Sequence, residues 1–485
     1  MENKNNSNIE VQKADIFIKE NMHKVNPRYR HKYHLMPPLN WCNDPNGLID
    51  IDGVYHVFYQ ANPYQAVWGP MHWGHQISTD FIKWQLLPTA LAPGKGYDHK
   101  FGAFSGSSLY EDGKLYLFYT ATNKFQNQAL AVSSDGVNFH KKKVLLFNGR
   151  NLPKGYSNAD FRDPKAFKYK GKYYFICGNR NDLTQDKQII LFESFKITGP
   201  YQFKNVFYKQ NNIGGITECP DLFFTKDKAV LLFSPQQLKN DVKYQFQNND
   251  SCVYTIGTLT DDMCFHNETE LQEFDYGFSF YASQIMPTND GRNVLIAWMR
   301  SWAEENVTKD DHWCGSMVLP REVELRNQHL YQKPVREVYN YLSNIIKVPD
   351  LMLNNESKKL FTASVSRITV DIRLNEQKDG VIGLELFKNS TYATKLYYDY
   401  HEELLVLDRN NAGNKLDGIR YAKIDSKEIL KLEIFLDVSS LEVFVNNGMF
   451  TMTAMICAPE TATEVCAYAT GQGTFMNITK ADFNL

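Results

Sequence analysis

The stretch DPNGLIDIDGVYHVFYQ, residues 44–60, carries the pattern that predicts the fold. A short apolar run leads into Asp52 and Gly53, and the β-rich run VYHVFY follows directly. Two apolar runs separated by Asp-Gly are typical of a β-hairpin, because these residues tolerate the positive φ angles that a tight turn requires. The stretch therefore predicts a pair of antiparallel strands.

Four further stretches repeat this pattern. They are SGSSLYEDGKLYLFYTA (105–121), DPKAFKYKGKYYFICGN (163–179), CPDLFFTKDKAVLLFSP (219–235) and SQIMPTNDGRNVLIAWM (283–299). The second apolar runs of the five stretches begin at residues 54, 115, 173, 230 and 294, so the spacings are 61, 58, 57 and 64 residues. A period of about 60 residues of β structure suits one four-stranded blade of a β-propeller. The near-constant spacing favours a five-bladed propeller over unrelated hairpins in a sandwich.

The composition changes towards the C-terminus, which predicts a second domain. All seven tryptophans lie at or before Trp313, and His401 is the one histidine beyond residue 330. The runs ITVDIRL, KLEIFLDVS and SLEVFVNNG alternate in the way typical of an antiparallel β-sandwich. We expect an all-β protein with a helical extension at 1–27, the five-bladed propeller at 28–335, a linker at 336–352 and a C-terminal β-sandwich at 353–485.

The N-terminal extension is expected to be a helix that packs on the main body. Val11, Ala14, Ile18, Met22 and Val25 recur at spacings of three and four residues, which places them on one helical face. The dipeptide that follows, Asn-Pro, is expected to end the helix.

Charge and cysteine usage exclude several classes of function. The formal net charge is -2, so no basic field predicts a nucleic-acid partner. The eight cysteines are scattered and form no metal-like spacing. The first residues lack the apolar core of a signal peptide, and no apolar run reaches the ~18 residues of a membrane span. We therefore expect a cytoplasmic protein with no membrane partner; the sequence leaves the oligomeric state open.

Three acidic residues occupy matching positions near the starts of different repeats. Asp44 stands in Asn-Asp-Pro, Asp163 in Arg-Asp-Pro and Glu218 in Glu-Cys-Pro. The innermost strand of each blade lines the central channel, so equivalent positions in different blades converge. Neighbouring acids push at least one pKa upward, and separated pKa values are what an acid/base pair needs. A single Asp-Pro is a common turn, but three acids in register predict a catalytic site.

Residues that suit a sugar surround these acids in the first repeats. Aromatic faces stack on sugar rings, and amides and hydroxyls satisfy sugar hydroxyls in a concave site. The candidates by this criterion are Trp41, Gln60, Trp68, Phe104 and Ser105. Arg162, directly before Asp163, is expected to help keep that acid ionised. Cys42 and Cys219 are expected to point into the blades, because neighbouring residues of a strand alternate sides.

The acidic motifs resemble the three signature motifs of glycoside hydrolase family 32. The matching segments are Trp41-Cys42-Asn43-Asp44-Pro45-Asn46-Gly47, Arg162-Asp163-Pro164 and Glu218-Cys219. Segments at 104–107, 313–315, 319–322 and 441–446 also look similar to family segments, and the resemblance covers nearly all of residues 30–485. The family includes invertases, sucrose-6-phosphate hydrolases, inulinases and levanases.

The resemblance implies a retaining β-fructofuranosidase that hydrolyses the terminal β-D-fructofuranosyl linkage of sucrose or sucrose 6-phosphate. It implies that Asp44 is the nucleophile, Glu218 the general acid/base and Asp163 the transition-state stabiliser. It places nine residues against the sugar: Trp41, Asn43, Gln60, Trp68, Phe104, Ser105, Arg162, Tyr281 and Trp298. Neither a metal nor an organic cofactor is expected, since a protein acid and a nucleophile suffice.

Three residues depart from the family pattern. Cys42 stands where Met is usual, and Ser279 and Ser283 stand where Asp and Pro are common. None of them removes an acid, so they affect the shape of the sugar subsites rather than the chemistry. The alternatives left open are a fructan hydrolase or fructosyltransferase on the same scaffold. A rival from another class is a non-catalytic carbohydrate-binding propeller, which would most simply lack one of the acids.

Overall fold

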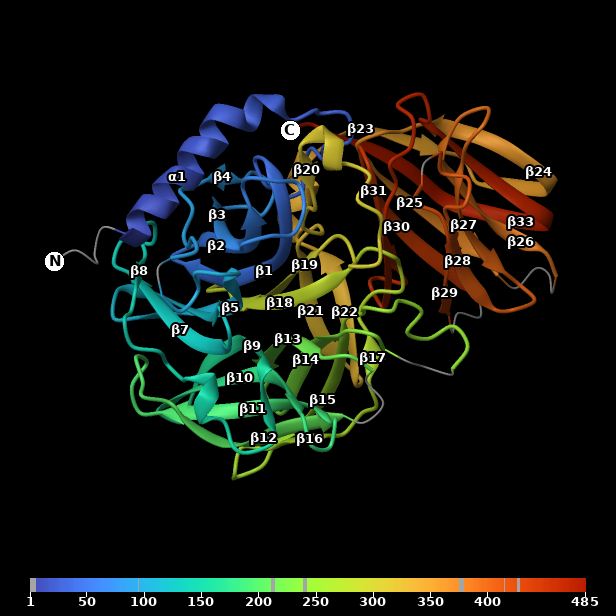
Figure 1. Cartoon of the computed structure of the whole chain (residues 1–485). Helices are drawn as coiled ribbons and strands as arrows, with labels where there is room; N and C mark the ends of the chain where they lie inside the picture. The colour runs from blue at the N-terminus through green and yellow to red at the C-terminus, as the bar shows by residue number, and fades with distance from the viewer. Residues whose placement is uncertain are drawn as a thin grey trace.

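The structure is a computed structural model that describes residues 6–94, 96–210, 214–238, 242–374, 379–413, 415–424 and 428–485. It confirms an all-β architecture with a five-bladed propeller and a second β domain packed beside it (Figure 1). None of the helices in the described ranges is long and apolar enough to cross a membrane.

Each of the five sequence repeats begins one blade of the propeller. Blade 1 contains β1 (Asn40–Ile51), β2 (Val54–Asn62), β3 (His72–Ser78), β4 (Gln85–Leu86) and the later β20 (Trp313–Cys314). Blade 2 contains β5 (Gly102–Glu111), β6 (Lys114–Thr122), β7 (Gln126–Ser133) and β8 (His140–Lys141). Blade 3 contains β9 (Tyr156–Tyr169), β10 (Lys172–Asn181), β11 (Lys187–Ser194) and β12 (Gln202–Gln210), preceded by the 3-10 turn η2 (Gly149–Asn151).

The last two blades complete the ring. Blade 4 contains β13 (Thr217–Phe224), β14 (Ala229–Pro235), β15 (Val253–Leu259), β16 (Phe265–Asn267) and β17 (Gln272–Glu273). Blade 5 contains β18 (Tyr281–Pro287), β19 (Asn293–Trp298), β21 (Arg321–Arg326) and β22 (His329–Pro334), with the 3-10 turn η3 (Lys309–Asp311) before β20. In every blade the strand that opens the repeat is followed by its hairpin partner in the same sheet.

The first hairpin shows why the repeat sequence folds this way. Ile51 pairs with Val54 across a two-residue turn, and both turn residues have positive φ angles, 52° for Asp52 and 81° for Gly53. This backbone twist matches the right-handed twist of the flanking strands. The turn residues that identified the repeat are therefore the ones that set its register.

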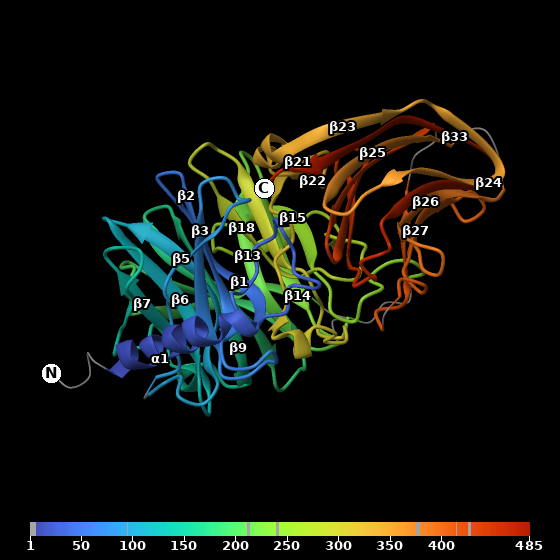
Figure 2. The same ribbon diagram turned by 90° about the horizontal axis from the view of Figure 1, so that it is seen from above.

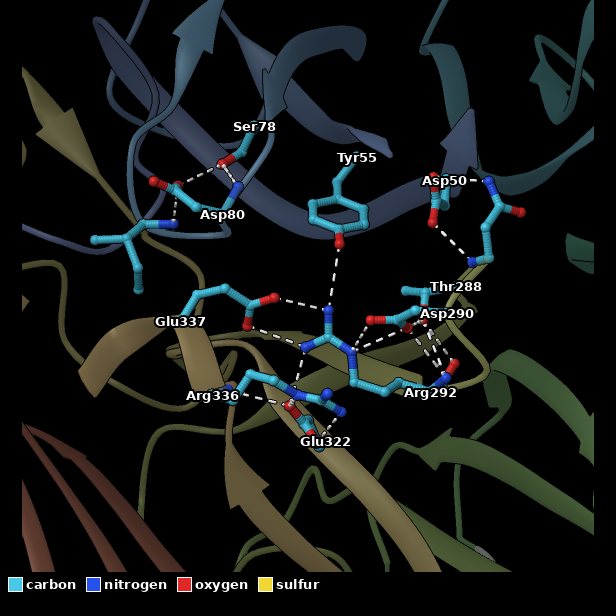
Figure 3. Close-up of polar contacts among 12 residues, drawn as sticks. Asp50, Tyr55, Ser78, Asp80, Thr288, Asp290, Arg292, Glu322, Arg336 and Glu337 are labelled. Atoms are coloured by element: carbon cyan, nitrogen blue, oxygen red, sulfur yellow. Dashed lines mark hydrogen bonds and ion pairs between the residues drawn. The ribbon is translucent and has the colours of Figure 1, made fainter. Parts of the chain in front are cut away.

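A network around Arg292 joins blade 5 to blade 1 (Figure 3). Arg292 lies at the β18–β19 turn; its guanidinium binds Glu322 at 2.9 Å and Glu337 at 2.7 Å, and it donates to the Tyr55 hydroxyl of β2 at 3.3 Å. Asp50 of β1 accepts from the backbone N–H of Asn289 at 2.8 Å. Together with the parallel pairing of β20 and β1, these contacts close the ring at its sequence ends.

The N-terminal helix lies along the first blade (Figure 1). It spans α1 (Asn6–Asn21) and continues as the 3-10 turn η1 (Met22–Lys24). Asp15 accepts from the backbone N–H of Thr89, and the Phe17 ring meets Tyr64 edge-on at 5.0 Å. The predicted apolar face is only partly covered: Ala14 is fully buried, whereas Met22 is 48% exposed.

The second domain is one eleven-stranded sheet folded into two layers (Figure 2). Its strands are β23 (Leu342–Val348), β24 (Leu351–Thr362), β25 (Ser366–Arg373), β26 (Val381–Lys388), β27 (Thr394–Asp399), β28 (Leu404–Asp408), β29 (Ile419–Lys423), β30 (Ile429–Asp437), β31 (Ser440–Val445), β32 (Phe450–Met455) and β33 (Glu464–Phe483). The long strand β33 joins the layers, because its first half pairs with β26 and its second half with β25.

The expected linker at 336–352 needs a correction. The connection between the domains is the short turn η4 (Arg336–Tyr341), and the residues directly after it form β23, which pairs with β33 of the second domain. The sequence pattern missed this strand because its partner lies more than a hundred residues further along the chain.

Buried charges connect the two domains. Glu442 of β31 accepts from Arg321 of blade 5 at 2.6 Å and contacts His34 at 2.8 Å, and the other ring nitrogen of His34 lies 2.8 Å from Asp437. Burial alone would lower the pKa of His34, but the two carboxylates raise it to about 9. Arg321 also binds Asp275 at 3.0 Å. Two of the segments that resembled the family, at 319–322 and 441–446, therefore meet at the domain interface.

Candidate active site

The three predicted acids lie on the innermost strands of three blades, each at an irregularity. Asp44 lies in β1, Asp163 in β9 and Glu218 in β13, and the pairing of each strand with its neighbour shifts register at that point. Asp163 has a φ of 65° and Cys219, next to Glu218, a φ of 46°. A bulge re-aims a side chain and bends its strand. The irregular backbone is thus what turns these three side chains towards one another.

Asp44 and Asp163 share a neighbour. The Cys219 thiol lies 3.5 Å from Oδ2 of Asp44 and 3.7 Å from Oδ2 of Asp163, and the backbone N–H of Cys219 donates to the same Asp163 oxygen at 2.9 Å. The expectation that Cys219 points into its blade is therefore wrong, because the left-handed backbone at this residue breaks the strand alternation. Cys42 is fully buried in the core between blades, as expected.

Neutral donors hold Asp44. Ser105 Oγ donates to Oδ2 at 2.6 Å and Asn43 Nδ2 donates to Oδ1 at 3.0 Å, while Trp41 Nε1 donates to the Asn43 side-chain oxygen at 2.7 Å. Asp44 is 8% exposed. Burial raises the pKa of Asp44, and the hydrogen bond from Ser105 opposes that rise. The chain Trp41–Asn43–Asp44 fixes the carboxylate plane.

Asp163 is buried among charges. Burial raises its pKa to about 7; the Arg162 guanidinium opposes this, and the charges of Glu218 and Asp44 add to it. The charge of Arg162 thus favours the ionised form of Asp163, as the sequence predicts, but within the described residues the two side chains share no hydrogen bond. Arg162 directs its hydrogen bonds to Glu218, at 3.0 and 2.9 Å, and to Asp160, at 3.0 Å.

The Glu218 carboxylate accepts from four donors. Oε1 receives Nε and Nη2 of Arg162, and Oε2 receives Gln236 Nε2 at 2.7 Å and the Tyr281 hydroxyl at 2.8 Å. The Tyr281 hydroxyl also lies 3.0 Å from the Ser234 carbonyl oxygen. Sequence reasoning missed Gln236. Its signal is the β13–β14 register: Glu218 pairs with Ser234, and Gln236, two residues further along, is the diagonal neighbour of Glu218.

The candidate sugar contacts are placed as follows. Gln60 is buried and donates to the Ala103 carbonyl at 3.1 Å. Trp68 is 43% exposed and meets the Phe104 ring edge-on at 6.1 Å. Trp68 follows β2 of blade 1 and Phe104 lies in β5 of blade 2, so the two rings bring neighbouring blades together.

The aromatic side chains that pack against Trp41 differ from the arrangement that the sequence predicts. Trp302 stacks on Trp41 with ring centroids 6.1 Å apart, although nothing in the sequence selects it over core tryptophans. Trp298 is fully buried at 5.8 Å from Trp41, and Tyr281 is fully buried as well. The predicted sugar contact by Trp298 therefore needs a correction: its ring supports Trp41 from behind. Tyr281 faces Glu218 through its hydroxyl.

Within the described residues, one group has the composition and spacing of a metal site. It consists of His31, His34 and Asp437, whose ligand atoms lie within 4.8 Å of one another. The group lies at the domain interface, and both ring nitrogens of His34 contact carboxylates. It therefore fits a buried ion-pair network better than a metal centre.

The chain is similar to a single family over both domains. The sequence models described as "Glycosyl hydrolases family 32 N-terminal domain" and "Glycosyl hydrolases family 32 C terminal" match residues 34–334 and 338–482. A sucrose-6-phosphate hydrolase of Zymomonas mobilis is 34% identical over 448 residues, covering 87% of this chain and 86% of the relative. A raffinose invertase of Escherichia coli is 34% identical, covering 90% and 91% of the two chains.

Solved structures agree with these sequence relatives. A β-fructofuranosidase of Bombyx mori, solved as a mutant in complex with sucrose, superimposes with a TM-score of 0.84 at 28% identity. The match covers 98% of each chain. The similarity thus extends over the propeller, the second domain and their arrangement.

Proposed function

The chain belongs to glycoside hydrolase family 32, and we propose that Asp44, Asp163 and Glu218 carry out its reaction. The protein is a glycoside hydrolase, a β-fructofuranosidase of sucrose or sucrose 6-phosphate. The observation that carries the residue assignment is the meeting of three acids from three blades, two of them at one thiol and the third beside a guanidinium.

Asp44 is the nucleophile in this proposal. Its two oxygens are held by Ser105 and Asn43, so the carboxylate is oriented before the sugar arrives. Asp44 attacks the anomeric carbon of the fructosyl unit, the bond to the departing oxygen breaks, and a fructosyl–enzyme ester forms. Retention requires that the Asp44 and Glu218 carboxyl groups lie roughly 5–5.5 Å apart.

Glu218 is the general acid and then the general base. It gives a proton to the departing oxygen and later removes one from the water that cleaves the ester. Oε1 is taken by the charged fork of Arg162, so the proton belongs on Oε2. Tyr281 suits both protonation states of Oε2. When Oε2 is ionised, the Tyr281 hydroxyl donates its hydrogen to it; when Oε2 carries the proton, the hydroxyl donates to the Ser234 carbonyl and accepts from Oε2.

Asp163 stabilises the transition state in this proposal. Its Oδ2 is held by the backbone N–H of Cys219, and its pKa near 7 lets the carboxyl group accept from or donate to a sugar hydroxyl near neutral pH. A hydrogen bond to a ring hydroxyl that strengthens as positive charge builds on the sugar lowers the barrier.

The assay that tests the proposal measures glucose and fructose released from sucrose. Hydrolysis predicts equal amounts of the two sugars. A transferase would release more glucose than fructose, and a fructan hydrolase would prefer longer chains over sucrose. A non-catalytic propeller would release neither sugar.

A cytoplasmic location is part of the proposal. A sugar phosphate does not cross a bilayer unaided, because its charge is costly in the hydrocarbon core. An enzyme for sucrose 6-phosphate is therefore expected where that sugar is made. Activity found in the cytosolic fraction of the source cells supports this location, and activity in the medium contradicts it.

A further inference from the structure

A polar cavity of about 250 Å³ lies between the propeller and the second domain. The propeller contributes Asn248, which precedes β15 of blade 4, Phe278, which lies between β17 and β18, and Ser301, which follows β19. The second domain contributes Arg409 and Arg420. Asn248 lies shortly before β15. Ser301 lies shortly after the end of β19, where Trp298 pairs with Tyr281 at the start of β18. Both positions lie at the end of the propeller where β13 and β18 begin, which is the end that holds Glu218.

Two short paths join this cavity to the acids. Asp250, two residues after Asn248, accepts from the backbone N–H of Gln237 at 3.4 Å, and the neighbouring Gln236 binds Glu218. On the other side, Trp302 follows Ser301 and stacks on Trp41. Asp250 and Gln237 thus lie between the cavity and the Gln236 that binds Glu218, and Trp302 lies between the cavity and Trp41.

Most charges in the cavity are paired. Arg409 binds Glu304 at 2.9 Å, and Lys415 binds Glu305 at 3.0 Å. Arg420 differs: no acidic side chain among the described residues forms an ion pair with its guanidinium. Asp417, which also lines the cavity, is exposed to solvent.

The contacts of Arg420 are neutral. Nε donates to the Asn248 side-chain oxygen at 2.8 Å, Nη1 donates to the Ile419 carbonyl at 2.9 Å, and the guanidinium stacks on the Phe278 ring at 4.2 Å. The Arg409 guanidinium lies on the same ring at 3.7 Å. Burial and the neighbouring Arg409 lower the pKa of Arg420 to about 10, and the charges of Glu304 and Glu273 only partly oppose this shift.

A guanidinium held by neutral groups is a ready site for an anion, because its fork matches the oxygens of a phosphate. The position of this cavity indicates which anion. A general acid protonates the departing oxygen, so the leaving sugar lies on the side of Glu218, and the cavity lies at the end of the propeller that holds Glu218.

We propose that Arg420 binds the phosphate of a phosphorylated leaving sugar, so that the second domain sets the preference for sucrose 6-phosphate over sucrose. This inference rests on the proposed function. It gives Arg420 a role in specificity, while the fructosyl unit is handled by the propeller alone.

The test compares kcat/KM on sucrose and on sucrose 6-phosphate for the full-length enzyme and two variants. Arg420→Gln is expected to lose about 10- to 100-fold on sucrose 6-phosphate, the range of a charge-assisted hydrogen bond, and to keep its activity on sucrose. Lys415→Gln, in the same cavity but paired with Glu305, is the matched control and is expected to leave the ratio of the two sugars unchanged.

Competition by products gives a second readout. Glucose 6-phosphate is expected to inhibit the unaltered enzyme more strongly than glucose does, and Arg420→Gln should remove the difference. If Arg420→Gln does not fold, Arg420→Lys takes its place and should lose part of the sucrose 6-phosphate activity only, since Lys keeps the charge but not the fork.

The outcomes separate this inference from the proposed function. An enzyme that cleaves neither sugar contradicts the proposed function. The role of Arg420 is overturned if the unaltered enzyme cleaves both sugars equally well. It is also overturned if Arg420→Gln loses the same factor in kcat/KM on both sugars, or loses activity on neither sugar. Each of these results leaves the proposed function intact.

Discussion

Arg162 makes two hydrogen bonds to one oxygen of Glu218, from Nε at 3.0 Å and from Nη2 at 2.9 Å. The contact joins blade 3 to blade 4 through residues that stand 56 positions apart in the sequence. It leaves the second carboxylate oxygen to Gln236 and Tyr281. The general acid of the proposed reaction is thus oriented by the blade that also supplies Asp163.

Replacing Arg162 by Lys should lower kcat on sucrose by about 10- to 100-fold, because an ammonium cannot reproduce the two-pronged contact and charge-assisted bonds are worth about 1.5–3 kcal/mol. The matched control is Arg180→Lys, since Arg180 shares the partner Asp160 but pairs with neither Glu218 nor Asp163. Steady-state kinetics on sucrose measure both. An Arg162→Lys enzyme with unaltered kcat would falsify the role of this contact.

Asp44→Asn should keep the fold and lose kcat by several orders of magnitude, because an amide has the shape of the carboxylate but is no nucleophile. The amide oxygen can still accept from Ser105, so the thermal midpoint should change little. Asp50→Asn, in the same strand but at the far end near Arg292, is the control and should keep normal activity. Near-normal turnover in the Asp44 variant would refute its assignment.

Asp163→Asn should stabilise the protein increasingly as the pH rises. The folded-state pKa of Asp163 is about 7 and its ordinary value 3.8, so between these values the folded protein holds a proton that the unfolded chain has released. The contribution of Asp163 to the free energy of unfolding therefore falls as the pH rises from about 4 to about 7, and it stays low at higher pH. Asn carries no such penalty, and its side-chain oxygen can accept from Cys219.

Thermal midpoints of the wild type and of Asp163→Asn between about pH 5 and pH 8 measure this effect. The thermal midpoint of the variant should exceed that of the wild type by an amount that grows up to about pH 7 and then levels off. A gap that is constant or that narrows as pH rises would show that the Asp163 carboxyl group is not held protonated by its surroundings.

Arg321→Ala should destabilise the protein by about 3–5 kcal/mol, because it leaves the Asp275 carboxylate buried without its cation and reduces the ion pairing of Glu442 to the contact with His34. The control is Arg367→Ala. Its pair with Glu433 is partly exposed, so its loss should cost no more than about 1 kcal/mol. Urea unfolding compares the two variants. Equal shifts in the two midpoints would mean that the interface network does not hold the domains together.

The fold could be predicted because each repeat carries its own turn residues. The Asp52-Gly53 turn sets the β1–β2 register locally, and the same local pattern recurs in each blade. The strand β23 could not be predicted this way. Its partner β33 lies at the other end of the second domain, and its exposed side chains show no clear alternation.

The acids could be predicted from their register across repeats, but their partners could not. Whether Arg162 turns to Asp163 or to Glu218, and whether Cys219 faces its blade or the acids, depends on bulges and left-handed residues that alternation rules do not anticipate. Gln236 and Trp302 reach the site from loops, where sequence spacing carries no direction. The chemistry was therefore visible in the sequence, and the pairing of its side chains was not.

The most direct test of the proposed reaction is to trap the covalent intermediate. Glu218→Ala is mixed with β-D-fructofuranosyl fluoride, whose leaving group needs no proton, so the first step proceeds while the second lacks its base. Digestion and mass spectrometry then locate the adduct. The account predicts that the peptide containing Asp44 gains the mass of one fructosyl unit, on that carboxylate. An adduct on another residue, or fluoride release with no adduct and with inverted fructose as product, would contradict it.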